Sequence, residues 1–244
     1  MLIRFIHSVA IIAALALAGV TSAQAQTRTV PVLELFTSQG CSSCPPADRL
    51  FERYALRDDV VALTLPVDYW DYLGWKDTLA NSENSMRQRL YAKARGDGAV
   101  YTPQVVVNGV AHVIGSKQSE IDQSISATRS TGIDVEIGVK KVGDQLEISV
   151  PQNEIDLGSS SVTVWFASVQ GQADVKVKRG ENRGRALSYY NVVRNLSAVG
   201  MWTGQPQTFR VPLHSVQHAD ATKCAVILQK GVGGPIIAAA WYKH

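Results

Sequence analysis

The sequence predicts an α/β domain followed by an all-β, sandwich-like domain. Hydrophobic periodicity changes near Gly132, with strands and helices alternating before it and short alternating apolar runs after it. Residues 26–132 are therefore expected to form the first domain and residues 133–244 the second. Of the 244 residues, 45% are hydrophobic and 18% are charged, a composition typical of a globular protein. The formal net charge of +3 does not favour a nucleic-acid partner.

Residues 1–25 have the order of a secretory signal peptide. Arg4 and His7 precede an apolar stretch at residues 9–20, and small residues follow at Ala23 and Ala25. The apolar stretch is about 12 residues long, whereas a membrane-spanning helix needs roughly 20. We expect cleavage after Ala25, export to the periplasm or out of the cell, and no membrane insertion afterwards. An uncleaved anchor is the alternative.

The first domain is expected to combine a parallel strand pair with an antiparallel hairpin, with helices on the faces. Asn108-Gly109 is a strong signal for the hairpin turn. The expected strands are Val30–Phe36, Val60–Val67, Gln104–Val107 and Ala111–Ile114, and the expected helices are Ala47–Leu56, Asn81–Arg95 and Ser119–Thr131.

The second domain shows about eight short alternating runs, typical of a β-sandwich. They are Val135–Val139, Leu146–Val150, Val162–Phe166, Val175–Val177, Tyr189–Val193, Phe209–Val211, Cys224–Leu228 and Ile236–Trp241. Cys224 lies in one of these runs and is expected to be a buried small hydrophobic residue.

Cys41 and Cys44 lie between the first strand and the first helix. Two intervening residues let the sulfurs meet across one turn, and an exported protein meets an oxidising compartment, so we expect a disulfide. Cys41 is the expected attacking thiol and Cys44 the resolving thiol. A helix N-terminus stabilises a thiolate, although Pro45-Pro46 weakens this effect by moving the helix start.

Two alternatives to a redox-active pair remain open. The disulfide can be an inert structural link, or two thiolates can hold Cu(I) as in a metallochaperone. Structural zinc needs four ligands, which neither a second cysteine pair nor a nearby His supplies. We therefore expect no resident metal and no cofactor.

Thr102-Pro103 directly precedes the expected hairpin. A thioredoxin-like fold places a cis-proline at this point, facing the dithiol, where the residue before it offers its backbone to an extended partner chain. We therefore expect Pro103 to be cis and part of the catalytic site, and Thr102 to contact substrate. An ordinary trans turn is the alternative.

Three segments carry a resemblance to a known family: residues 32–48 (VLELFTSQGCSSCPPAD), residues 67–77 (VDYWDYLGWKD) and residues 100–109 (VYTPQVVVNG). Together they resemble the exported thioredoxin-like family called domain of unknown function 1223. The resemblance covers nearly the whole chain. It implies a thioredoxin-like N-terminal half and a β-rich C-terminal half, and it implies fold more than function.

Several residues near the pair are candidates for the site. Glu34, in the apolar first strand, is a candidate buried acid that passes a proton to the resolving cysteine, or else a strand-edge acid facing water. Asp68, Trp70 and Trp75 are candidate substrate-binding residues, with core packing as the alternative. A basic cluster is expected at a solvated hairpin tip, with an acidic partner as the alternative: Lys176, Lys178, Arg179, Arg183 and Arg185.

These observations predict an exported thiol–disulfide oxidoreductase that acts on protein or small thiols, with a membrane-bound redox protein as a candidate partner. A non-enzymatic binding module with a structural disulfide is the second hypothesis, and a Cu(I)-binding protein is the third.

Overall fold

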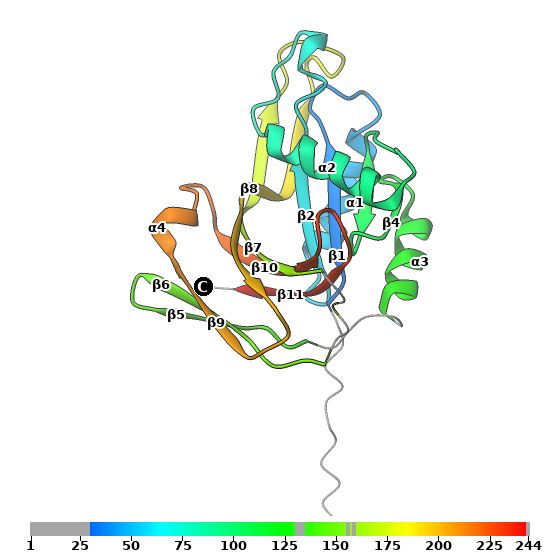
Figure 1. The fold of residues 1–244 in the computed structure, drawn as a ribbon. Coiled ribbons are helices and arrows are strands. Elements are labelled where there is room, and N and C mark those ends of the chain that lie inside the picture. The colour runs from blue at the N-terminus through cyan, green and yellow to red at the C-terminus, as the bar shows by residue number, and fades with distance from the viewer. Residues whose placement is uncertain (1–29, 130–134, 155–156, 158–159, 243–244) are drawn as a thin grey trace, which may run out of the picture.

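The computed structural model describes residues 30–129, 135–154, 157 and 160–242 (Figure 1). The expected signal peptide and the expected boundary at Gly132 lie outside these residues. No helix in the described ranges has the length and apolar character needed to cross a membrane.

The described strands form two sheets. The larger, eight-stranded sheet contains, in spatial order, β11 (Ile236–Tyr242), β10 (Lys223–Lys230), β7 (Val162–Lys176), β8 (Ala186–Trp202), β2 (Val61–Pro66), β1 (Val32–Thr37), β3 (Gln104–Val107) and β4 (Ala111–Ile114). The smaller sheet contains β5 (Gly138–Val142), β6 (Gln145–Val150) and β9 (Gln207–Pro212). The helices are α1 (Pro45–Ala55), α2 (Ser82–Arg95), α3 (Gln118–Arg129) and the short α4 (Leu213–Val216), with a 3₁₀ turn η1 (Asp71–Leu73).

The predicted fold class is wrong. We expected a thioredoxin-like α/β domain beside a sandwich-like β domain, but one mixed sheet contains strands from both segments. The sheet is continuous because β2 and β8 pair in parallel at Thr64 and Val192. The Thr64 hydroxyl donates to the Tyr190 carbonyl at 2.6 Å, and Asn191 Nδ2 donates to the Ala62 carbonyl at 2.9 Å. The chain is therefore mostly β, with few helices in its described part.

Helices cover both faces of the N-terminal strands. Side chains alternate along β1, so Leu33 and Leu35 point to one face and Val32 and Phe36 to the other. The first face packs on α1 and α3, and the second packs on α2 through Tyr91. Because α1 begins directly after Cys44, the disulfide lies on the α1 side of the sheet.

The C-terminal core lies between the two sheets, where Phe166 and Trp202 are fully buried. The expected run Val162–Phe166 and the start of the run Val175–Val177 belong to one strand, β7, which has 15 residues and pairs with the 17-residue β8. This long hairpin extends beyond the C-terminal core and reaches the segment after β2, at the top of Figure 1.

Candidate functional site

Cys41 and Cys44 form a disulfide, with their Cα atoms 5.4 Å apart, so the predicted pairing is confirmed. Cys44 is the N-cap of α1, and Pro45 begins the helix. Cys41 is 4% exposed and Cys44 is fully buried, so Cys41 is the more accessible sulfur. Cys224 is fully buried in β10, and burial raises the pKa of its thiol to about 11. Its predicted burial is therefore confirmed.

The tip of the β7–β8 hairpin, residues 177–185, covers the disulfide loop. Asn182 is fully buried, and its Nδ2 donates to the carbonyl oxygens of Gln39, at 2.9 Å, and Cys41, at 2.8 Å. The Glu181 carboxylate accepts from the Ser42 backbone N–H at 3.2 Å. These partners are about 140 residues apart in the chain, so no local pattern could have revealed the contact.

The aromatic segment after β2 closes a second side of the loop. Trp75 Nε1 donates to Gln39 Oε1 at 2.8 Å, and Asp77 accepts from the Gln39 backbone N–H at 2.7 Å. Trp70 Nε1 donates to Thr102 Oγ1 at 2.8 Å. Both indole N–H groups therefore hold neighbouring loops in place. That Trp70 and Trp75 bind substrate stays a prediction.

Asp68 lies at the start of the same segment and is half-buried. Its carboxylate accepts from the Ser85 hydroxyl, and its backbone N–H donates to the same hydroxyl. Asp68 thus anchors the aromatic segment to α2. Its role in substrate binding stays a prediction.

The Thr102–Pro103 peptide bond is cis, as predicted, and it lies beside the disulfide loop. The Ser43 hydroxyl donates to the Thr102 carbonyl at 3.4 Å. An open hollow of about 500 Å³ adjoins this point, lined by Tyr69, Trp70, Tyr72, Arg89, Val100, Tyr101 and Thr102. The structure therefore brings Cys41, Cys44, Thr102, Pro103 and Trp70 together.

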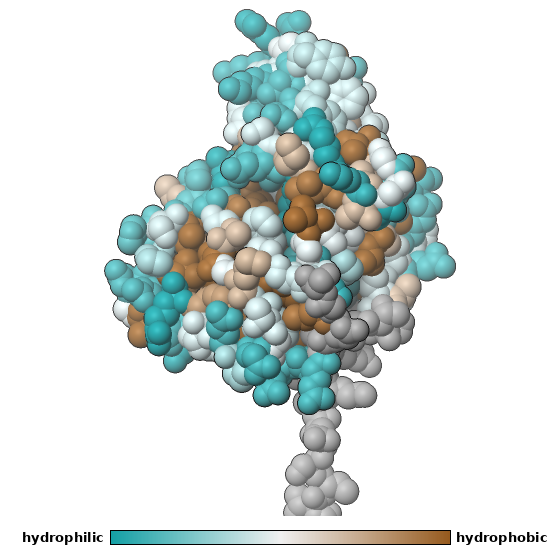
Figure 2. Space-filling view, viewed as in Figure 1, coloured by the Kyte–Doolittle hydropathy of each residue, from teal (hydrophilic) through white to brown (hydrophobic). Residues whose placement is uncertain are grey.

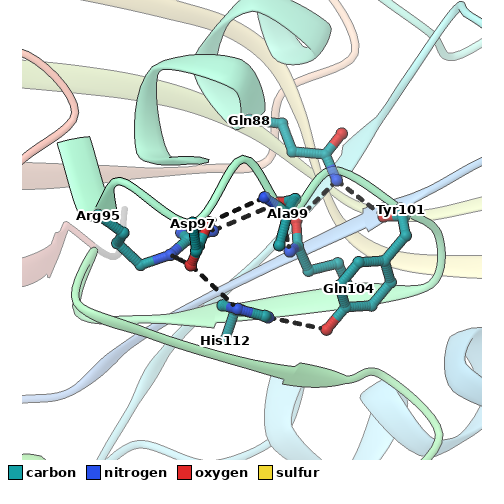
Figure 3. A network of polar contacts seen from close by, with 7 residues as sticks. All are labelled: Gln88, Arg95, Asp97, Ala99, Tyr101, Gln104 and His112. Carbon is teal, nitrogen blue, oxygen red and sulfur yellow. Dashed lines mark hydrogen bonds and ion pairs between the residues drawn. The ribbon is translucent and has the colours of Figure 1, made fainter. Parts of the chain in front are cut away.

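A polar network holds the chain before Pro103 (Figure 3). Asp97 accepts from Arg95 Nε at 2.7 Å and from the Ala99 N–H at 2.9 Å, and Arg95 lowers the pKa of Asp97 to about 2. His112 lies between Asp97, at 3.2 Å, and the Tyr101 hydroxyl, at 2.9 Å. These contacts fix residues 97–101, just ahead of Thr102, against the end of α2 and against β4.

Glu34 does not lie with the cysteines. It points to the α2 face of the sheet, where it forms an ion pair with Arg87 at 2.6 Å and accepts from the Tyr91 hydroxyl. Alternation along β1 decides this: its neighbours Leu33 and Leu35 occupy the α1 face. The structure thus places the predicted proton-transfer acid across the sheet from the helix that carries the disulfide.

The Glu34–Arg87 pair lies beside a different feature, an apolar hollow of about 420 Å³ between α2 and the β10–β11 turn. Its lining includes Arg87 together with Met86, Leu90, Trp165, Leu196 and Val232. Figure 2 shows apolar side chains gathered on the surface over this part of the molecule.

Asp48 is the buried acid that the sequence reasoning missed. It lies in the first turn of α1, four residues after Cys44, a spacing that places side chains on one helix face. Its Oδ1 accepts from the Thr37 hydroxyl at 2.6 Å, and its Oδ2 is buried without a partner among the described residues. Burial raises the pKa of Asp48 to about 8. Its spacing from Cys44 was the signal that could have identified it.

Two further groups share this buried region. Burial raises the pKa of Asp77 to about 6, and nearby Asp48 and Asp77 add to the effect of burial in raising the pKa of Tyr189. The Tyr189 hydroxyl is buried without a hydrogen-bond partner in the described ranges. At neutral pH Asp48 and Tyr189 therefore hold their protons, whereas most of Asp77 is ionised.

The chain is similar to a known family and to solved structures. The model of a family described as "Protein of unknown function (DUF1223)" matches residues 32–229. No curated protein matches the sequence. A crystal structure of a protein from Agrobacterium tumefaciens is similar at 37% identity and a TM-score of 0.77, covering 90% of this chain and 96% of that one.

A second solved structure, HBP35 of Porphyromonas gingivalis, is similar at 13% identity and a TM-score of 0.57. The likeness covers 88% of this chain and 75% of that one, and at this identity it concerns the fold alone.

Proposed function

The chain belongs to the DUF1223 family of proteins of unknown function, and we propose that it is an exported thiol–disulfide oxidoreductase that uses Cys41 and Cys44. The observation that carries this proposal is Asp48, a buried carboxyl in the first turn of α1, four residues after Cys44, with a pKa of about 8 and an oxygen that has no partner among the described residues. A purely structural disulfide has no use for such a group, whereas a leaving thiolate needs a proton donor.

The proposed reaction transfers two electrons in two exchange steps. A substrate thiolate attacks Cys41 Sγ, the Cys41–Cys44 bond breaks, and Cys44 leaves as a thiolate. Asp48, which holds a proton below about pH 8, protonates Cys44. A second substrate thiolate then attacks the substrate sulfur of the mixed disulfide, which releases Cys41 and an oxidised substrate dimer. In the opposite direction, Asp48 accepts the proton from Cys44.

The residues around Cys41 support a substrate site. Cys41 is the more exposed sulfur, and the cis-Pro103 loop lies beside it. In this proposal the Thr102 carbonyl, now bonded to Ser43, becomes available to a substrate backbone when Ser43 rotates away. The proposed substrates are protein or small thiols outside the cytoplasm, with a membrane-bound redox protein as the candidate partner.

The test is the reduction potential of the pair, measured in a glutathione buffer series with thiol trapping. A value between about −120 and −270 mV supports exchange. The Cys41→Ser variant should lose oxidation of 2-mercaptoethanol and form no mixed disulfide, whereas Cys224→Ser, the matched control in β10, should behave as wild type. Unchanged oxidation of 2-mercaptoethanol by Cys41→Ser would contradict the proposal.

A structural disulfide in a binding module is the second candidate, favoured by the 4% exposure of Cys41 and its cover by Asn182. In that case the pair should resist reduction down to potentials below about −300 mV. Replacing both cysteines by Ser should then lower the free energy of unfolding without affecting any redox activity.

A further inference from the structure

The hairpin tip and its flanks carry five cations that the proposed reaction does not use. All five are exposed, and none forms an ion pair with another described residue. They are Lys176, Lys178, Arg179, Arg183 and Arg185. We call them the cation cluster. Cations this close together repel one another, which disfavours the compact state. We therefore expect a function that uses their charge.

The cation cluster adjoins the disulfide through Asn182 and Glu181, which contact the backbone of Cys41 and Ser42. Arg183 follows Asn182 directly, and Arg179 is three residues before it. Consecutive Cα atoms are about 3.8 Å apart. The cluster therefore lies at a distance from Cys41 comparable with the Debye length of about 10 Å at 0.1 M salt.

Few anions offset the cluster. On the hairpin itself, Glu181 accepts from Ser42, and Asp174 accepts from Gln172 and Ser188. Asp48, in the first turn of α1, is neutral below about pH 8, because burial raises its pKa. Asp77, whose pKa is about 6, is ionised at neutral pH, but it is 3% exposed and accepts from the Gln39 N–H. The approach to Cys41 from the hairpin side is thus positively charged.

We propose that the cation cluster selects anionic thiols of low molecular mass as the substrates of the Cys41–Cys44 pair, which deepens the function proposed above and rests on it. The low mass follows from the 4% exposure of Cys41, since a bulky partner cannot reach so enclosed a residue unless the covering hairpin tip moves. The anionic group follows from the charge of the approach, which raises the local concentration of anions and their rate of encounter.

The chemistry balances with two molecules of such a thiol. Each loses one proton to become a thiolate, and together they give two electrons to the Cys41–Cys44 bond and leave as one disulfide. The protein ends with two thiols, whose protons replace the two that the substrates released.

The test compares three thiols of similar size that differ in charge: 2-mercaptoethanesulfonate, 2-mercaptoethanol and cysteamine. The second-order rate of disulfide reduction is measured for each and divided by its thiolate fraction. At an ionic strength of about 20 mM we expect the sulfonate to react at least about tenfold faster than cysteamine, with 2-mercaptoethanol between them. At about 1 M salt the three rates should converge, because the field is screened.

Two matched variants locate the effect. The triple variant Lys178→Gln, Arg179→Gln, Arg183→Gln keeps Glu181 and Asn182. It should react with the three thiols at equal corrected rates. The control variant Lys93→Gln, Lys117→Gln, Lys141→Gln removes the same charge outside the hairpin. It should keep the wild-type order of rates, fastest with the sulfonate and slowest with cysteamine. If wild type reacts with all three thiols at equal rates at low salt, the substrate selection is wrong, although the exchange function stands. If no thiol reduces the pair, the exchange function itself fails.

Discussion

Two buried acids lie on opposite faces of the same sheet, and they differ in their partners. Glu34, on the α2 face, forms an ion pair with Arg87 and accepts from the Tyr91 hydroxyl. Asp48, on the α1 face, has one hydrogen bond, from Thr37, and an oxygen without a partner in the described part of the chain. A paired carboxylate keeps its charge in the interior, whereas an unpaired one keeps its proton. Burial alone therefore does not identify a proton-transfer residue, because its partners decide its charge.

The largest expected effect concerns Asp48. In the unfolded chain Asp48 loses its proton above about pH 4, whereas the folded protein holds it up to about pH 8. Between these values the unfolded state binds fewer protons, so the free energy of unfolding falls as pH rises, by about 1.4 kcal/mol per pH unit. The Asp48→Asn variant cannot titrate at this position. It should therefore become progressively more stable than wild type from pH 4 to pH 8.

Urea unfolding across this pH range measures the difference, and Asp144→Asn, at an exposed turn, serves as the control. In the same Asp48→Asn variant, an added thiol should reduce the Cys41–Cys44 disulfide more slowly than in wild type, because Cys44 loses its proton donor. A constant stability difference from pH 4 to pH 8 would show that Asp48 is ionised in the folded protein.

The Arg87→Met variant should break the pairing on the other face. It leaves Glu34 buried without its counter-charge, which costs about 3–5 kcal/mol of stability. Because Glu34 lies across the sheet from α1, the rate of thiol exchange per folded molecule should not change. Denaturant unfolding and the rate with 2-mercaptoethanol give the two readouts. A slower exchange rate in folded Arg87→Met would place the ion pair in the redox site after all.

The Asn182→Ala variant should sharpen the comparison between the α1 and α2 faces of the sheet, because Asn182 contacts the disulfide loop on the α1 side. It leaves the Gln39 and Cys41 carbonyls without their donor, which costs about 1–3 kcal/mol. With its cover loosened, the disulfide should react faster with neutral 2-mercaptoethanol. An unchanged rate together with lost stability would mean that the hairpin tip does not limit access to Cys41.

Local sequence patterns predicted much of the structure near the disulfide. The expected strand Val30–Phe36 corresponds to β1, and the expected Asn81–Arg95 helix corresponds to α2. The Cys41–Cys44 disulfide, the cis bond before Pro103 and the turn at Asn108-Gly109 were also predicted. These features depend on residues only a few positions apart, where spacing and backbone preference carry the information.

The sequence by itself therefore determined the N-terminal strands and helices and the disulfide of this protein, because each follows from short-range spacing. Tertiary structure alone decided that β8 joins β2 in one sheet, that Asn182 contacts Cys41, and that Glu34 faces α2 rather than the helix that begins at the disulfide. The first two join segments more than 120 residues apart. The third depends on which face of β1 packs on α1. Hydrophobic alternation shows that a strand has two faces, but the neighbour that each face meets is decided only when the whole chain packs.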